Sequence, residues 1–169
     1  MKSRKRDSDS FSFLKGEPMA DWHKILVAVD DSSLSEQVLN YVGEVVGGID
    51  KVEICLLHVY PEPPPYYFAE KHTLQEYREE KETASLKIFS RAGKVLESHA
   101  IAGTRITTSC LMATGKTFSK TILQVQKDGG FGTVVLGKRG ISKAEEFLFG
   151  SVSNAVIRES HDFTVWVVS

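Results

Sequence analysis

Short, uninterrupted apolar runs alternate along this chain with segments of helical periodicity, and this alternation most constrains its fold. Such runs are typical of strands that are buried on both faces, as in a parallel sheet. We predict five strands, at residues 24–30, 52–58, 106–113, 132–137 and 164–168. Because helical patterns separate the strands, we expect an α/β, doubly wound, five-stranded parallel sheet with helices on both faces.

The predicted helices begin at recognisable signals. The segments Ser33–Glu36 and Thr73–Glu76 both read as capping boxes, and Gly47-Gly48 closes the first helix. A third helix is expected to begin near Phe118 and to end at Gly129-Gly130. The inward positions of these three helices are predicted to be Leu34, Val38, Leu39, Val42, Val45, then Leu86, Phe89, Leu96, then Phe118, Ile122, Val125.

Two further segments complete the prediction. Residues 150–160 are expected to form a short helix with Val152, Val156 and Ile157 inward. The segment Tyr60–His72 contains four prolines and is predicted to be a loop, because proline disfavours both helices and ladders. Its aromatic side chains could form a lid over a ligand or belong to a flexible loop.

The charge balance and the ends of the chain exclude several classes. The 169 residues carry 21 Lys+Arg and 22 Asp+Glu, a net charge of -1, which argues against a dedicated nucleic-acid binder. No apolar run is long enough for a membrane span, and the charged N-terminus does not resemble a secretory signal, so we expect a cytoplasmic protein. Residues 1–21 are predicted to be a disordered tail, and residues 22–169 a single domain.

The two cysteines, Cys55 and Cys110, lie in separate apolar or β-prone runs. We interpret them as reduced thiols, with a disulfide possible only if their strands are neighbours. No cysteine or histidine spacing is typical of a zinc site. His58 is interpreted as a strand-end histidine with a satisfied hydrogen bond rather than a general base, because no nucleophile accompanies it.

The residues that follow the first and fourth predicted strands point to a ligand. Asp30-Asp31-Ser32 ends the first strand, and Gly137-Lys-Arg-Gly140 ends the fourth. In doubly wound sheets, ligands bind at the carboxyl ends of strands where the strand order reverses. An aspartate there can accept hydrogen bonds from a ribose or an adenine amino group, and free amides at Gly150-Ser151 favour an anion. These residue types suit a nucleotide.

The residues Gly137, Gly140, Gly150 and Ser151 together form the pattern G-x2-G-x9-G-S. With KILVAVDDS at the first strand and FGSVSNAVI at the last helix, this pattern resembles the universal stress protein family in its ATP-binding branch. The resemblance covers nearly all of residues 24–168. It implies a Rossmann-like nucleotide-binding fold with strand order 3-2-1-4-5, and a homodimer formed through the last strand. Thr164 stands where the family often has proline, which leaves that dimer open.

The resemblance also implies roles for individual residues. Asp30 and the backbone of Ala28 and Val29 would contact the adenosine part of the ligand, and Val59 would line the base pocket. Gly137 and Gly140 would border the ribose and phosphates, whereas a simple turn role is the alternative. The phosphate chain would bind mainly backbone amides of Gly150, Ser151, Val152 and Ser153. Lys138 and Arg139 could add positive charge or face solvent.

The sequence thus predicts a regulatory stress-response domain whose cofactor is ATP, AMP or ADP, with Mg²⁺ as a potential companion. Two alternatives stay open: a slow ATPase or phosphotransfer enzyme, and a nucleotide-free dimerising module. No catalytic residue is assigned. Thr114–Thr117 contains the letters GKT but lacks the upstream glycine of a P-loop, so we interpret it as unrelated to phosphate binding. Asp30 could also act merely as a cap before the first helix.

Overall fold

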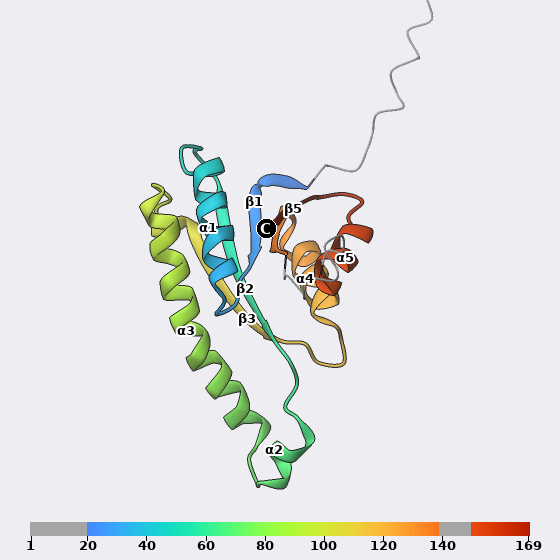
Figure 1. Ribbon diagram of the computed structural model, residues 1–169. Helices are drawn as coiled ribbons and strands as arrows, with labels where there is room; N and C mark the ends of the chain where they lie inside the picture. Colours follow the sequence, from blue (N-terminus) through green and yellow to red (C-terminus); the bar gives the residue numbers. More distant parts are fainter. Residues whose placement is uncertain (1–19, 139–149) are drawn as a thin grey trace, which may run out of the picture.

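The computed structural model describes residues 20–138 and 150–169, and Figure 1 shows its arrangement. The strands are β1 (Asp21–Ala28), β2 (Glu53–Tyr60), β3 (Ile106–Met112), β4 (Phe131–Gly137) and β5 (Thr164–Val168). The helices are α1 (Ser33–Val46), α2 (Pro65–Ala69), α3 (Leu74–Ser98), α4 (Phe118–Gly129) and α5 (Ser151–Arg158), with a short 3-10 turn at Gly103–Arg105.

The five strands form one sheet in the order β3-β2-β1-β4-β5, and every neighbouring pair is parallel. This confirms the predicted fold class. The strand order reverses between β1 and β4, because the chain moves outward on one side through β2 and β3 and then returns to the other side. Strand β1 begins at Asp21, earlier than the predicted Lys24, and it pairs irregularly with β4 between Asp21 and Ile25.

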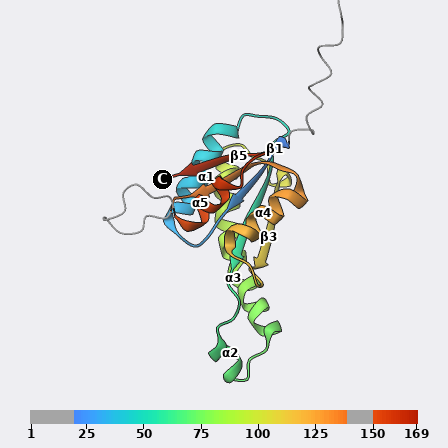
Figure 2. The same cartoon turned by 90° about the vertical axis from the view of Figure 1, so that its right-hand side faces the viewer.

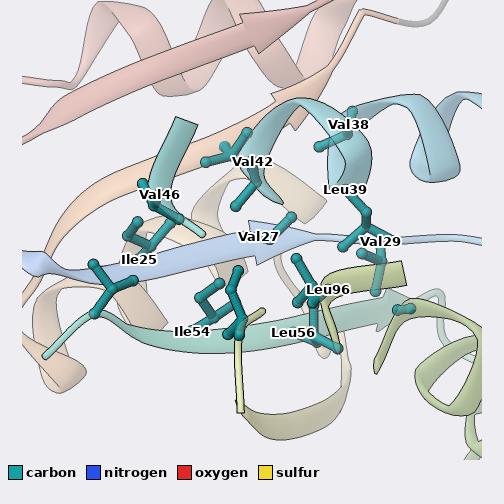
Figure 3. Close-up of a cluster of buried hydrophobic side chains, with 14 residues drawn as sticks. Ile25, Val27, Val29, Val38, Leu39, Val42, Val46, Ile54, Leu56 and Leu96 are labelled. Atoms are coloured by element: carbon teal, nitrogen blue, oxygen red, sulfur yellow. The ribbon is translucent and has the colours of Figure 1, made fainter. Parts of the chain in front are cut away.

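Helices α1 and α3 cover one face of the sheet, and α4 and α5 cover the other (Figure 1). The α1–α3 face holds the larger buried cluster, in which β1 and β2 supply alternate side chains such as Val27 and Leu56 (Figure 3). Helix α1 contributes Val38 and Val42, and α3 contributes Leu96, all nearly inaccessible to water. The opposite face holds a smaller cluster: Leu26, Cys55, Leu57, Ile122, Val134, Leu136 and Val156.

The contact between α1 and α3 depends on two glycines. A Cβ added to Gly43 would lie 2.4 Å from the ring of His99, and one added to Gly47 would lie 2.2 Å from the His99 carbonyl oxygen. His99 Nε2 lies 3.0 Å from Oδ1 of Asn40 on the same helix, which fixes the ring above Gly43. Small residues on α1 therefore let the end of α3 approach closely.

The start of α1 differs from the prediction. Ser32, not Ser33, is the N-cap, and its hydroxyl accepts the backbone N–H of Ser35 at 3.4 Å. The pattern Ser33–Glu36 is therefore not a capping box. Ser32 is the N-cap because the Asp30 carboxylate accepts hydrogen bonds from its backbone N–H and its hydroxyl. These bonds hold Ser32 at the start of the helix. The second capping box is confirmed, with Thr73 and Glu76 bonded reciprocally at the start of α3.

The proline-rich segment contains a helix, so the prediction of a continuous loop over Tyr60–His72 was wrong. Helix α2 begins with Pro65, a position where the missing N–H has no helical partner in any case. Tyr60 also belongs to β2 and pairs with Met112 of β3. Figures 1 and 2 show α2 and the first turns of α3 extending away from the sheet as an arm, here defined as residues 61–84.

Three predicted inward positions were wrong. Val45 is 43% exposed and Val46 is buried in its place, while Leu86 is 66% exposed next to the buried Ser85. Ile157 is 36% exposed, although Val156 beside it is fully buried. In each case the apolar residue stands one position from the buried one, so it points about 100° away around the helix.

The cysteines are free thiols, as predicted, although β2 and β3 are neighbours. Cys55 lies opposite Thr107 and Cys110 lies opposite His58, so the two cysteines are not paired across the strands. Burial raises the pKa of both thiols, which disfavours the reactive thiolate. None of the described helices has the length and hydropathy needed to cross a bilayer.

Candidate functional site

A cleft of about 250 Å³ opens at the carboxyl ends of β1 and β4, where the strand order reverses. Among the described residues it is lined by Ala28, Val29, Asp30, Ser32, Leu34, Ser35, Leu57, Val59, Phe118, Ile122, Leu136, Gly137, Gly150, Ser151, Val152 and Ser153. These residues come from five separate stretches of the chain. The cleft is therefore a product of the tertiary fold at the place where doubly wound sheets bind ligands.

The cleft brings together most of the predicted site residues. It contains the β1-end group of Ala28, Val29 and Asp30, the residue Val59 after β2, and Gly137 at the end of β4. The predicted phosphate segment, residues 150–153, also lines it in full. Lys138 does not line the cleft; its backbone N–H instead donates to Val168 of β5 at 2.7 Å. Arg139 and Gly140 lie outside the described residues.

Asp30 organises the loop between β1 and α1. Its Oδ1 accepts the hydroxyl of Ser35 at 2.7 Å and the backbone N–H of Ser32 at 3.1 Å. The backbone N–H of Asp30 in turn donates to the Ser35 hydroxyl at 2.8 Å. These bonds hold the carboxylate at the cleft wall and shape the entrance to α1, so a cap-like structural role coexists with a position suited to contacting a ligand.

The backbone of Val29 is already used within the protein. Its N–H donates to the Leu57 carbonyl at 2.9 Å, and its carbonyl accepts Nδ1 of His58 at 2.9 Å. His58 thus has the satisfied hydrogen bond that the sequence predicted. A carbonyl oxygen has a second lone pair, so Val29 can still accept a bond from a ligand but has no N–H left to donate.

The N-terminus of α5 lies at the cleft. Gly150 is the N-cap and has no side chain to satisfy them, and the first helical bond runs from Asn154 N–H to the Gly150 carbonyl at 3.0 Å. The N–H groups of residues 151–153 precede that bond and have no acceptor within the helix. Ser153 is buried and its hydroxyl donates to the Gly137 carbonyl at 3.5 Å, which joins α5 to β4. This geometry favours an anionic group.

Gly137 is also required for packing, a role that the sequence did not predict. A Cβ at this position would lie 2.9 Å from both Cγ and Cδ2 of Leu34. The first turn of α1 therefore packs against the end of β4 because Gly137 has no side chain. Gly137 borders the cleft as predicted. Its small size is also required by the close approach of Leu34.

An apolar wall of the cleft was not predicted as part of the site. It consists of Leu57 and Leu136 from the sheet, and of Phe118 and Ile122 from α4. The helical spacing of Phe118 and Ile122 predicted an inward face. Only the placement of α4 over β2 and β4 reveals that this face borders the cleft. Ser32 and Ser35 were likewise missed, and their position two and five residues after Asp30 was the available signal.

The comparison with known families settles the relationship of this chain. Residues 21–169 match the universal stress protein family. The chain belongs to this family. A curated relative, universal stress protein YxiE from Bacillus subtilis (strain 168), is 30% identical over 142 residues, which cover 80% of this chain and 91% of the relative.

Solved structures share the fold of this family member. The hypothetical protein MJ0577 superimposes with a TM-score of 0.69 at 23% identity, covering 87% of this chain and 95% of that chain. A universal stress protein from Archaeoglobus fulgidus in complex with dAMP has a TM-score of 0.57 at 22% identity, over 86% and 97% of the two chains. A universal stress protein in complex with cAMP has a TM-score of 0.59 at 17% identity, over 86% and 95%.

Proposed function

We propose that this chain is a nucleotide-binding regulatory domain of the ATP-binding branch of its family. The observation that carries the proposal is the cleft at the strand-order reversal, where Asp30 and the amides of α5 line one cavity. Two structures of the same fold contain an adenine nucleotide, dAMP in one and cAMP in the other. An acceptor for ribose or amino groups and donors for phosphate are the two requirements of such a ligand.

The proposed orientation of the nucleotide follows from the different chemistry of its phosphate and adenosine parts. The phosphates would bind the first-turn amides of α5, with Ser151 adding its hydroxyl and Gly150 allowing close backbone approach. The adenosine part would lie against Asp30 and Val59, with the Val29 carbonyl as an additional acceptor. ATP is the expected ligand, with ADP or AMP as alternatives.

Mg²⁺ could bind in the cleft together with the nucleotide phosphates. Among residues 20–138 and 150–169, no group of three or more His, Cys, Asp and Glu side chains could hold a metal ion. Mg²⁺ commonly takes few protein ligands and keeps phosphate oxygens and waters in its shell. Any Mg²⁺ here would therefore arrive with the nucleotide, and Asp30 is the carboxylate among the described cleft residues that could assist it.

The regulatory part of the proposal rests on how the cleft loop connects to the rest of the molecule. Asp31, next to Asp30, pairs with Arg91 of α3 at 3.0 Å. Both side chains are largely exposed, so the pair contributes little stability but links the loop to the helix that bears the arm. A ligand that contacts Asp30 better in one arrangement of this loop than in another would shift the population toward that arrangement. The position of α3 relative to the loop would then change with it.

Calorimetric titration with ATP, ADP and AMP tests the nucleotide proposal. The full chain is expected to bind at least one of them, and Gly150→Val is expected to weaken binding strongly because a side chain would intrude between the amides and the phosphates. Gly48→Ala is a matched control, since a Cβ there meets no atom within 4 Å. An absence of binding at millimolar nucleotide would contradict the proposal.

The enzyme alternative has its own outcome in the same samples. Release of phosphate from ATP that Asp30→Asn abolishes would favour slow hydrolysis over a purely regulatory role. Binding without release would favour regulation.

We also propose that β5 mediates a homodimer. Strand β5 is an edge of the sheet, and its half-buried residues Val165–Val168 have a β4 partner on one side. Trp166 packs edge-on against Tyr41 of α1, and Tyr41 itself is 45% exposed. Such an apolar edge favours pairing with another strand. Light scattering of the wild type and of Val167→Lys tests this: the wild type is expected to be dimeric and the variant monomeric, whereas a monomeric wild type would contradict the dimer.

A further inference from the structure

Phe118 occupies an unusual position for a phenylalanine. It is the first residue of α4, it is half-buried, and it lines the cleft. It belongs to neither buried hydrophobic cluster and is not among the half-buried residues packed against them. Phe131 and Phe163, by contrast, pack against the cluster on the same face of the sheet. Core packing therefore does not explain the Phe118 ring.

The start of α4 fixes where the ring lies. Thr117 is the N-cap, and its hydroxyl accepts the backbone N–H of Lys120 at 3.3 Å. The Thr117 hydroxyl also lies 2.9 Å from the hydroxyl of Ser119, which is buried. A capped first turn with a buried neighbour holds the backbone of Phe118 in place, so the ring is presented to the cleft from a rigid element.

The surroundings of the ring are aliphatic. Leu57, Val59, Ile122 and Leu136 line the same cleft, and Phe118 is the one aromatic ring among the described residues that line it. The hydroxyls and the carboxylate of the described cleft residues come from the β1–α1 loop, the first turn of α1 and α5 instead. The α4 side of the cleft therefore offers apolar area and one π-face, which suits a planar heterocycle better than a sugar or a phosphate.

Hydrogen-bond donors near the end of β1 are already engaged. The N–H of Val29 donates to Leu57 and the N–H of Asp30 donates to Ser35. A base bound beside them finds acceptors for its amino groups but few donors for its ring nitrogens, so shape and stacking have to supply part of the recognition. Stacking on an aromatic ring is effective for any base, because every base has a π-face. A purine has two fused rings and buries more apolar area on the aromatic ring than a pyrimidine does.

We propose that Phe118 is a specificity-determining residue that stacks on the base of the bound nucleotide and favours purines over pyrimidines. This inference rests on the proposed nucleotide function and adds the residue that selects a purine base. Removing a base–aromatic stack typically weakens binding by roughly 5- to 150-fold. The loss is expected to be larger for purine nucleotides, which cover more of the ring.

Calorimetric titration of ATP, GTP, CTP and UTP into the wild type, Phe118→Leu and Phe118→Tyr tests the inference. Leucine keeps the apolar volume and removes the π-face, whereas tyrosine retains the ring. Phe118→Leu is expected to weaken ATP and GTP binding by roughly 5- to 150-fold, to weaken CTP and UTP less, and Phe118→Tyr to remain close to the wild type. Phe68→Leu, on the exposed α2, is the matched control and is expected to change nothing.

The outcomes separate this inference from the function on which it rests. Wild-type affinity for ATP in Phe118→Leu, or an equal loss for all four nucleotides, would overturn the stacking role while leaving nucleotide binding established. A wild type that binds none of the four would overturn both. Thermal unfolding of each variant without nucleotide distinguishes a loss of stacking from a loss of fold, since a half-buried residue outside the core is expected to alter the midpoint little.

Discussion

The two faces of the sheet are built differently. The α1–α3 face rests on helices of 14 and 25 residues and encloses the larger buried cluster, which includes Val27, Val42 and Leu96. The α4–α5 face has helices of 12 and 8 residues, a smaller cluster and the cleft. The difference indicates that the two faces have different roles: one face supplies most of the buried hydrophobic contacts, and the other leaves room for a ligand.

The two faces also differ in how closely their helices pack. On the filled face, α3 approaches α1 so closely that the His99 ring occupies the space beside Gly43. On the open face, the first turns of α4 and α5 border a cavity and contribute Phe118 and Ser151 to its wall. Close packing transmits any change of volume, whereas a cavity can absorb one. Matched substitutions on the two faces should therefore have unequal effects.

The largest expected effect comes from leucine truncation. Leu96→Ala removes a fully buried side chain of the filled face and is expected to lower the free energy of unfolding by about 2–5 kcal/mol. Leu136→Ala, in the smaller cluster beside the cleft, is expected to lower it less, because side chains next to the cleft can relax into the space that the truncation leaves. Urea unfolding of both variants measures the difference. Equal losses would show that the cleft wall is packed as tightly as the core.

A smaller effect is expected from glycine substitution within the filled face. Gly43→Ala places a methyl group 2.4 Å from the His99 ring and should destabilise the fold by about 1–3 kcal/mol. Gly93→Ala in α3 is the matched control, since a Cβ there meets no atom within 4 Å. It should instead stabilise the protein by about 0.5–1 kcal/mol through helix propensity. Thermal unfolding of the pair checks the opposite signs, and a tolerated Gly43→Ala would mean that the α1–α3 contact is loose.

The smallest effect is expected at the first turn of α3, which belongs to the arm. Hydrogen bonds from the backbone and side chain of Thr73 lower the pKa of Glu76 below its ordinary value of 4.5. A lowered pKa in the folded state means that the stabilising contribution is present at neutral pH and is lost as the pH falls below 4.5 through the folded value. Glu76→Gln should therefore lower the thermal midpoint slightly at neutral pH, and the difference from the wild type should shrink in acid. A pH-independent difference would contradict the capping box.

The sequence allowed the fold class to be predicted, because strands buried on both faces and separated by helices leave few topologies. It also placed Asp30 and Gly150-Ser151 in one site, since the carboxyl ends of parallel strands share an edge, and the family resemblance added Val59, Val152 and Ser153. The apolar wall from α4 could not be predicted in this way. Helical spacing showed that Phe118 faces inward, but not whether a core or a cavity lies opposite.

Local rules failed where tertiary contacts decide between neighbouring positions. Ser32 and Ser33 are both acceptable N-caps by type, and the carboxylate of Asp30 selects Ser32. Four prolines argued against a helix, yet Pro65 is tolerated because it stands at the first helical position. Val45 and Val46 are equally apolar, and the approach of α1 to the sheet determines which one is buried. These errors concern a cap, a short helix and single inward positions, and none of them changes the topology.

The composition of the cleft from five distant chain segments has a consequence for folding. Its walls are complete only when the crossovers that set the strand order are all in place, so an unfolded chain offers a ligand no comparable surface. Any molecule that binds there is therefore coupled to the entire unfolding equilibrium and stabilises the native state by mass action. If the ligand is the proposed nucleotide, the free energy of unfolding would therefore depend on the nucleotide concentration.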